Sequence, residues 1–249
     1  MTFDQIKIYI FSALAALIAL TVHEFCHGYA AYKMGDRTAK NLGRLTLNPI
    51  KHLDPIGTIC MIFFHIGWAK PVPVNPRNFK DPKKGFAITA LAGPSINLIL
   101  GFFSAGLYLL VFAIFKDVAF TEKNFTFNLI QNTITFLSVF FSVNIGLGIF
   151  NLLPIPPFDG SRILHAFLPP KIYFGIMKYE RQIYFGVLAW LFLGDAIVRV
   201  LRALPIISST SWLYTAVGIF SLGDIFAAII SFVSGLILNF WQLIPFLKI

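Results

Sequence analysis

Long, uninterrupted apolar stretches constrain the fold of this chain more than any other feature of its sequence. A membrane-spanning helix needs about 20 consecutive apolar residues. Within a bilayer, backbone hydrogen bonds can be satisfied only inside helices or closed barrels, and continuous runs of this length predict helices. We therefore expect an all-α polytopic membrane protein with about five transmembrane helices, near Ile6 to Lys33, Phe86 to Phe115, Leu129 to Leu153, Ile183 to Val200 and Leu213 to Trp241. The fourth of these stretches contains Asp195 and Arg199, so an interfacial or re-entrant placement is its alternative.

The charged residues indicate how these spans are oriented. Only 12% of the 249 residues are charged, against about a quarter in soluble domains. Half of the 20 Lys and Arg fall between Lys33 and Lys84 and four more between Arg162 and Arg181. Cytoplasmic loops of membrane proteins are enriched in such residues, so both stretches are predicted to be cytoplasmic. The net charge of +9 is thus explained by the positive residues of the cytoplasmic loops. We expect the lipid bilayer as a partner and no nucleic acid.

The first span carries polar residues that are costly in a bilayer. Its sequence HEFCH places His23, Glu24 and His27 in an HExxH motif. On a helix, residues four apart share a face, so both imidazoles can bind one metal ion while the carboxylate lies beside them as a base. Ionisable groups within a span indicate function by default. The motif predicts the metal centre of a zinc metalloprotease.

A catalytic zinc has three protein ligands and an open position for water. Two are supplied by the HExxH motif, and the candidates for the third are His52, His65, His165 and the acidic residues. Among these Asp159 stands out, because it follows the proline-rich sequence NLLPIPPFDG at the cytoplasmic end of the third span, the depth predicted for His27. Prolines there end the helix and turn the chain back. An ordinary cytoplasmic turn is the alternative for the same sequence.

The segment after the first span is neither a normal loop nor a normal span. Asn41 to Asn48 is rich in Thr and Leu and bounded by turn formers, which favours a strand. The apolar run from Ile56 to Ala69 is too short to cross a bilayer easily, so we expect it to be re-entrant. Lys70 to Arg77 carries three prolines and should be extended. Together these patterns predict a short re-entrant or β-hairpin element whose edge could pair with a substrate backbone.

Several motifs taken together resemble one known family. HEFCH, NPIKHLDPIG, GWAKPVPVNP, AGPSIN and NLLPIPPFDG resemble the site-2 protease family of intramembrane zinc metallopeptidases, peptidase family M50, and especially its compact members without PDZ or CBS domains. The resemblance covers Thr21 to Leu164. We expect one membrane-embedded domain over residues 1–249, in which the C-terminal helices within residues 183–241 have no assigned role.

The resemblance also implies roles for particular residues. It implies one Zn²⁺ per chain, a glutamate that activates the zinc-bound water, an asparagine that lines the active site, and an asparagine and a proline that engage substrate. From its position alone, the active-site asparagine could equally be an oxyanion donor or a hydrogen-bonding residue between helices. The implied zinc ligands are His23, His27 and Asp159, and the implied base is Glu24. The asparagine that lines the active site is Asn97, and the substrate contacts are Asn151 and Pro154.

The implied function is hydrolysis of peptide bonds in or near the transmembrane segments of membrane-anchored protein substrates. The expected location is a bacterial cell (inner) membrane, with the active site toward the cytoplasmic side. Two other classes fit the buried ionisable residues: an ion-binding transporter and a catalytically silent membrane adaptor. A transporter should often show inverted repeats or paired broken helices, and none is visible. No residue pattern specifies an oligomeric state.

Overall fold

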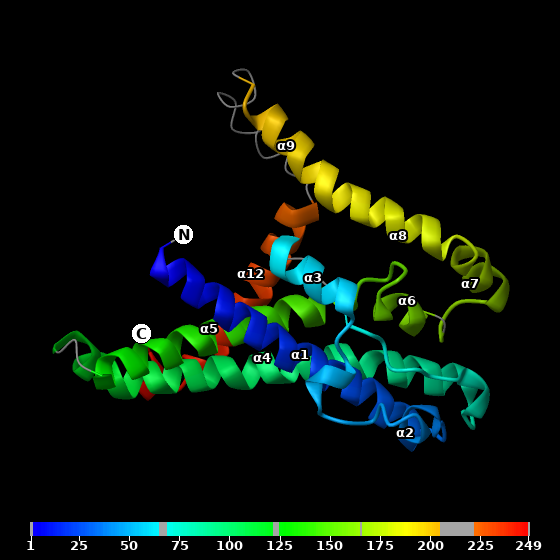
Figure 1. Cartoon of the computed structure of the whole chain (residues 1–249), viewed down its shortest axis with the longest axis horizontal. Helices are drawn as coiled ribbons and strands as arrows, with labels where there is room; N and C mark the ends of the chain where they lie inside the picture. The colour runs from blue at the N-terminus through cyan, green and yellow to red at the C-terminus, as the bar shows by residue number, and fades with distance from the viewer. Residues whose placement is uncertain (1, 65–68, 122–124, 165, 205–221, 249) are drawn as a thin grey trace.

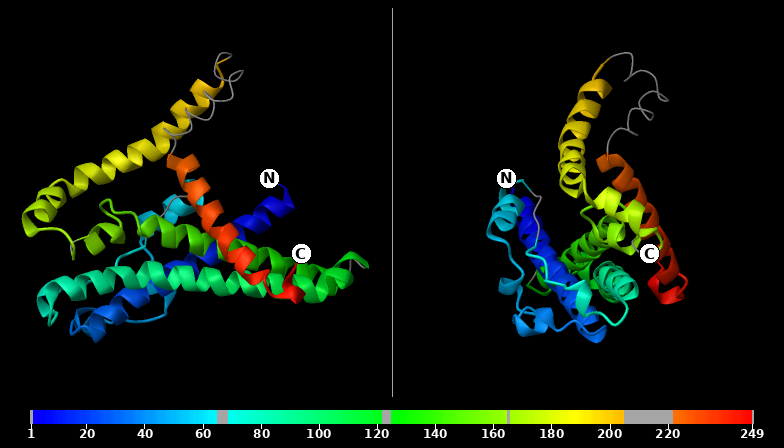
Figure 2. Two further views of the ribbon diagram at one scale, coloured as in Figure 1. Left: turned by 180° about the vertical axis from the view of Figure 1, so that it is seen from behind. Right: turned by 90° about the vertical axis from the view of Figure 1, so that its right-hand side faces the viewer.

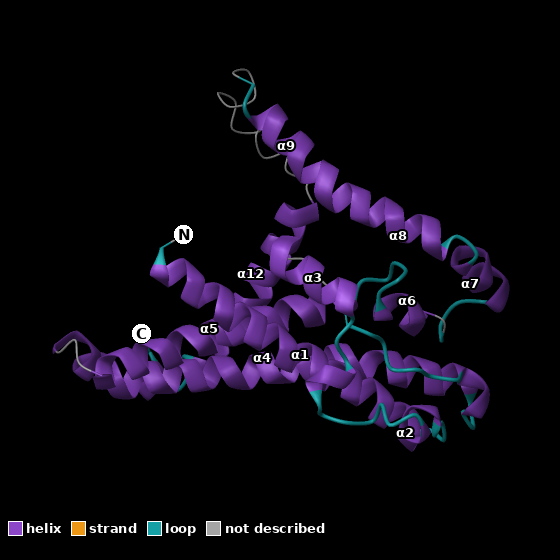
Figure 3. Ribbon diagram, in the orientation of Figure 1, coloured by secondary structure: helices purple, strands orange, loops and turns teal. Residues whose placement is uncertain are grey.

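The computed structural model of the chain describes residues 2–64, 69–121, 125–164, 166–204 and 222–248. Its regular structure is helical throughout these ranges (Figure 3). The one β-type contact in them is an isolated antiparallel bridge between Leu53 and Ala69. The predicted all-α class is confirmed, whereas the predicted β-hairpin is not formed.

Four helices are long and apolar enough to cross a membrane within the described ranges. Each coincides with one of the predicted spans, and the last of these had been expected to begin within residues 205–221, which lie outside the described part. The helices are α1 (Phe3–Lys33), α4 (Pro82–Thr121), α5 (Phe125–Asn151) and α12 (Leu222–Trp241).

The predicted span from Ile183 to Val200 is not among these four helices. This stretch consists of α8 (Glu180–Ala189), a π-helical segment (Trp190–Gly194) and α9 (Asp195–Arg202). The three parts follow one another without a gap (Figure 1). Together they rise about 34 Å, enough to cross a bilayer core of about 30 Å, so this span stays a prediction. Arg202 on α9 also forms an ion pair with Asp224 at 2.8 Å.

The predicted strand from Asn41 to Asn48 is corrected by the structure. Its first residue ends the short helix α2 (Thr38–Asn41), and Gly43 then turns the chain in the left-handed region at φ 64°. A neighbouring extended segment, Lys70 to Asn75, contains two prolines. Since proline lacks the N–H that a strand ladder requires, this neighbour cannot complete a regular sheet.

The two ends of the apolar segment that follows this loop lie next to each other. Lys70 N donates to the carbonyl of His52 at 2.8 Å, next to the bridge between Leu53 and Ala69. Between these ends lies α3 (Pro55–Phe64), which rises about 15 Å, or half the bilayer core. The chain therefore enters and leaves this segment at neighbouring residues, and its re-entry into a bilayer stays a prediction.

Helices α1, α4 and α5 pack side by side and form the body of the molecule, and α12 crosses the α4–α5 pair (Figures 1 and 2). The α4–α5–α12 contact is built on a buried cluster of Ala105, Phe141 and Ile145. Trp241 of α12 packs against it, and its indole N–H donates to the carbonyl of Phe102 at 2.9 Å. Glycines at these crossings let the helices approach closely, as is usual where apolar packing alone cannot drive association in lipid.

The remaining helices lie at the ends of this body. The short helix α6 follows α5, and α7 leads into α8 and α9, which extend away from the packed helices (Figure 1). Short 3₁₀ turns complete the described structure. The bounds are α6 (Asp159–Leu164), α7 (Pro170–Met177), η1 (Pro49–Lys51), η2 (Pro76–Asn78) and η4 (Pro245–Leu247).

A buried carboxylate joins the end of α1 to the chain that precedes α4. Asp36 is fully buried and accepts hydrogen bonds from Asn75 N at 2.7 Å and Asn78 Nδ2 at 2.8 Å. The backbone and hydroxyl of Thr38 also donate to it. Burial raises the pKa of Asp36, but these hydrogen bonds outweigh it, and the net pKa is below the ordinary value. The folded state therefore favours the ionised carboxylate.

We expect Asp36→Ala to lower the free energy of unfolding at neutral pH by roughly 2–4 kcal/mol, because buried donors lose their acceptor. A group whose pKa is depressed on folding stabilises the protein above its unfolded pKa, near 4, and stops doing so as the pH falls through the folded value. The difference in thermal midpoint between wild type and Asp36→Ala in detergent should therefore shrink below about pH 4. A difference that stays constant down to about pH 2 would contradict this role.

Candidate active site

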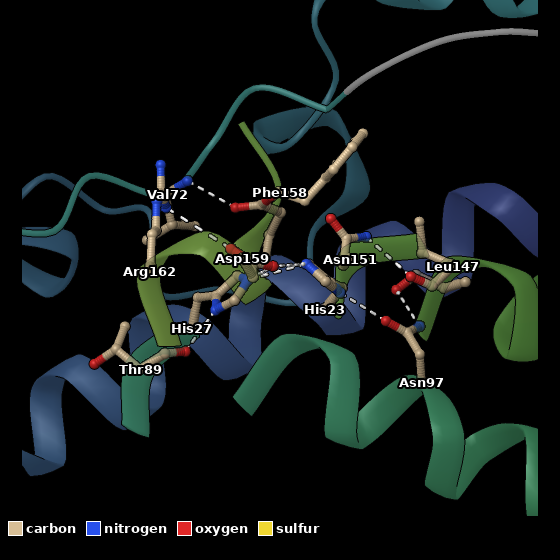
Figure 4. Close-up of polar contacts among 12 residues, drawn as sticks. His23, His27, Val72, Thr89, Asn97, Leu147, Asn151, Phe158, Asp159 and Arg162 are labelled. Atoms are coloured by element: carbon tan, nitrogen blue, oxygen red, sulfur yellow. Dashed lines mark hydrogen bonds and ion pairs between the residues drawn. The ribbon is translucent and has the colours of Figure 1, made fainter. Parts of the chain in front are cut away.

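Two histidines of α1 and one aspartate of α6 point toward one another (Figure 4). His23 Nε2 and His27 Nε2 lie 2.9 Å apart. Asp159 Oδ2 lies 3.2 Å from the first nitrogen and 3.0 Å from the second. All three side chains are buried, with 4%, 8% and 7% of their residue surfaces exposed.

The outer ring nitrogens determine which protons these histidines carry. His23 Nδ1 lies 2.6 Å from Asn97 Oδ1, and His27 Nδ1 lies 2.7 Å from the carbonyl of Thr89. Both partners are acceptors, so each Nδ1 must carry a hydrogen and donate it. In the neutral imidazole the opposite nitrogen is then a bare acceptor. Both Nε2 atoms therefore present lone pairs toward Asp159.

The orientation of the Asn97 amide follows from its other contacts. Its Nδ2 donates to the carbonyl of Ala19 at 3.3 Å and to Asn144 Oδ1 at 2.9 Å. Asn144 Nδ2 in turn donates to the carbonyl of Phe140 at 2.9 Å. Since both carbonyls can only accept, neither amide can be flipped without losing a bond. Asn97 thus lies between helices, as one of its two predicted roles requires, and it also holds the ring of His23.

Three acceptor atoms that meet in a buried place require a cation. The residues fit zinc, because histidine nitrogens and a carboxylate are its ordinary ligands. Tetrahedral ligands at about 2.0–2.2 Å from one ion lie about 3.3–3.6 Å apart, and the separations observed here are slightly shorter, at 2.9–3.2 Å. Within the described residues, His23, His27 and Asp159 are the group that could hold a metal ion.

Glu24, the candidate base, lies next to the ligand His23 on α1. Its Oε2 accepts a hydrogen bond from the backbone N–H of Val72 at 2.7 Å. The described hydrogen bonds of this carboxylate use that oxygen alone. The other oxygen remains available for a proton, as general-base catalysis requires.

Comparison with known proteins places this geometry in a family. The profile of peptidase family M50 matches residues 11–193. The chain belongs to peptidase family M50. It is therefore a zinc metalloprotease, as the HEFCH motif predicted. The match includes every ligand of the candidate centre and extends beyond the motifs that first indicated the family.

Curated relatives of this M50 peptidase include the Bacillus subtilis protein named Putative zinc metalloprotease YwhC. It is 38% identical over 216 residues, which cover 87% of this chain and 90% of that protein. Putative zinc metalloprotease Rip2 of Mycolicibacterium smegmatis is 27% identical over 68% of this chain and 61% of its own length. Zinc metalloprotease MJ0392 of Methanocaldococcus jannaschii is 29% identical over 65% and 34%. No solved structure matches the chain.

The turn between α5 and α6 brings Asp159 of the M50 peptidase back to α1. Gly160 packs so closely against the carbonyls of Leu152 and Leu153 that any side chain would overlap them. The ring of Phe158 packs on Phe150 with centroids 4.3 Å apart. This explains why a proline-rich turn ending in Asp-Gly suits the third ligand.

No described hydrogen bond joins the other predicted residues of the M50 peptidase to the ligand atoms. Asn151 ends α5, and its side chain donates to the carbonyl of Leu147 at 3.0 Å. Pro154 is exposed in the turn that follows. His52, one of the candidates for the third ligand, is buried, and its Nε2 lies 2.8 Å from the carbonyl of Thr46 in the loop after α1.

Sequence reasoning missed several contributors. Asn144 had a recognisable signal, since it is an amide within an apolar helix. The carbonyl of Thr89 and the N–H of Val72 are backbone groups, so the residue types at these positions do not indicate their role. His65 and His165, weighed above as ligands, lie outside the described residues.

Gly93 on α4 permits the histidines to lie where they do. A methyl group there would overlap Nε2 of His27 and lie 2.6 Å from its Cε1 and 2.7 Å from Cε1 of His23. We expect Gly93→Ala to abolish stoichiometric zinc binding, although alanine is favoured over glycine within helices by about 1 kcal/mol.

Metal analysis of the purified variant tests this expectation. Gly235→Ala on α12 is the matched control, because a methyl group there meets nothing within 4 Å. It should keep its zinc. Normal zinc content in Gly93→Ala would show that α4 can move away from the site at little cost.

Proposed function

We propose that this M50 peptidase is an intramembrane endopeptidase that hydrolyses peptide bonds in or near the transmembrane segments of membrane-anchored proteins. The observation that carries the proposal is the convergence of three buried acceptor atoms at α1, a helix that is apolar and long enough to cross a bilayer. His23 and His27 lie on α1, and Asp159 begins α6, the short helix that follows α5. A soluble substrate would not require the site to be built there.

Each residue has a defined part in the proposed reaction. His23, His27 and Asp159 hold the zinc, which when bound polarises the scissile carbonyl and lowers the pKa of its water. Glu24 takes a proton from the attacking water and delivers it to the leaving amine as the C–N bond breaks. Asn97 keeps the ring of His23 in the tautomer that leaves Nε2 free to bind metal.

The site is proposed to face the cytoplasmic half of a bacterial inner membrane. From His27 to the end of α1 at Lys33 is about 9 Å of helix, and the residues that follow carry much of the positive charge. A helical substrate hides its peptide bonds, so it must unwind before cleavage. Asn151 and Pro154 remain proposed substrate contacts, at the end of α5 and in the exposed turn that follows it.

Comparison of wild-type and Glu24→Gln membranes tests the proposal. Each form is expressed in the same bacterial host, and the new N-termini of membrane proteins are identified by mass spectrometry. We expect termini that occur only with the wild type and that map within or next to transmembrane segments. Termini confined to soluble loops would contradict intramembrane cleavage, and zinc-loaded protein without any Glu24-dependent termini would favour the adaptor alternative.

A further inference from the structure

The general base is contacted by an extended segment, Lys70 to Asn75, which we term the strap. The strap has the sequence KPVPVN. Proline has no N–H, so Val72 carries the one backbone donor between Lys70 and Val74. That donor lies 2.7 Å from Glu24 Oε2. The alternation of proline and valine therefore presents a single hydrogen bond to the carboxylate.

Arg44 holds the strap immediately before this contact. Its Nη2 lies 2.7 Å from the carbonyl of Lys70 and 3.3 Å from that of Pro71. The Nε of Arg44 is buried without a hydrogen-bond partner among the described residues. The side chain as a whole is half-buried. Its described hydrogen bonds all go to the two strap carbonyls.

The strap is fixed on further sides as well. Lys70 N donates to the carbonyl of His52 at 2.8 Å, and Asn75 N donates to the buried Asp36 at 2.7 Å. The side chain of Val72 packs over Gly28 on α1, where a methyl group would lie 3.1 Å from it. The backbone at Val72 consequently has little freedom to move relative to Glu24.

We propose that Arg44 is a positioning residue for the general base. By binding the carbonyls of Lys70 and Pro71, it keeps the Val72 N–H on Oε2 of Glu24, so that the carboxylate is held in one orientation with its other oxygen ready to accept a proton. This inference rests on the proposed function. It adds the loop between α1 and α4 to the parts of the chain that control the rate of hydrolysis.

The first test measures the contact itself and needs no substrate. Protein labelled with ¹⁵N-valine is studied by NMR in detergent, and the Val72 amide is assigned from the signal that Val72→Pro removes. An amide that donates to a carboxylate should be shifted downfield and protected from hydrogen exchange. We expect Arg44→Ala to lose both features, Arg44→Lys to retain part of them, and the exposed-arginine control Arg37→Ala to keep them. An unchanged Val72 signal in Arg44→Ala overturns the proposal.

The second test separates positioning from general stability. A membrane substrate identified through its Glu24-dependent cleavage is used, and zinc content is measured in each variant. We expect Arg44→Ala and Val72→Pro to lower kcat by about 10–100-fold, with KM within about twofold and zinc still bound, and Arg44→Lys to recover part of the rate. Val74→Pro is the control for an added proline, because Val74 N donates no hydrogen bond in the described structure.

The outcomes distinguish this inference from the proposed function. If no substrate is cleaved, the proposed function fails while the Val72 signal still reports whether Arg44 holds the strap. If the signal is lost in Arg44→Ala but kcat is unchanged, the positioning role is overturned. A rise in kcat would overturn it too, because the strap would then restrain Glu24 from acting.

Discussion

Asp159→Ala is expected to leave the protein without bound zinc. The carboxylate oxygen lies 3.0 and 3.2 Å from the two histidine nitrogens, and no other described acidic or histidine side chain joins that group. Two histidines alone give an incomplete site for a metal that uses three protein ligands. Affinity should fall by more than the roughly 10–100-fold that loss of a ligand's hydrogen-bond partner costs.

Metal analysis after dialysis against a chelator of known affinity checks this result. Wild type should hold about one zinc per chain. Asp4→Ala serves as control, because Asp4 lies exposed in the first turn of α1 and contacts only Lys7 in the described structure. Retention of zinc at wild-type affinity by Asp159→Ala would mean that another group supplies the third ligand.

Glu24→Gln should separate metal binding from catalysis. Glutamine has nearly the shape of glutamate, and its carbonyl oxygen can still accept the hydrogen bond from Val72 N. Zinc content and thermal midpoint should therefore stay near those of wild type. The variant lacks the base that takes the proton from water, so kcat should fall by about 10²–10⁴-fold.

The measurement is turnover of a membrane substrate by zinc-loaded protein. Glu180→Gln provides a matched substitution on α8, away from the metal ligands. It should cleave at the wild-type rate. Should Glu24→Gln retain most of its activity, a different residue would have to act as the base. Loss of zinc together with activity would instead indicate that the Val72 contact stabilises the metal centre.

Much of the site could be predicted because it is encoded locally. HEFCH lies on one helix, and the spacing of four residues between its histidines determines that they share a face. The proline-rich turn before Asp159 is also local, and its predicted return to α1 has a physical basis in the close packing of Gly160. Long apolar runs predicted the four candidate spans in the same way.

The predicted strand was wrong because a local preference competed with long-range partners. Asn41 to Asn48 has the composition of a strand, but a strand requires a neighbour with free N–H groups, and the prolines of the strap remove them. The pairing of Arg202 with Asp224 is likewise decided by how α9 lies relative to α12.

The metal ligands and the base of this chain could therefore be predicted from its sequence, whereas the contacts that orient them could not. Long apolar runs and the HExxH spacing are properties of single segments, so they can be recognised in the sequence alone. The proton positions on His23 and His27 depend on Asn97, Asn144 and the carbonyl of Thr89, contributed by other helices. Likewise, the backbone N–H on Glu24 comes from a segment 48 residues away. Backbone groups are common to nearly all residues, so only packing decides which of them reaches the site.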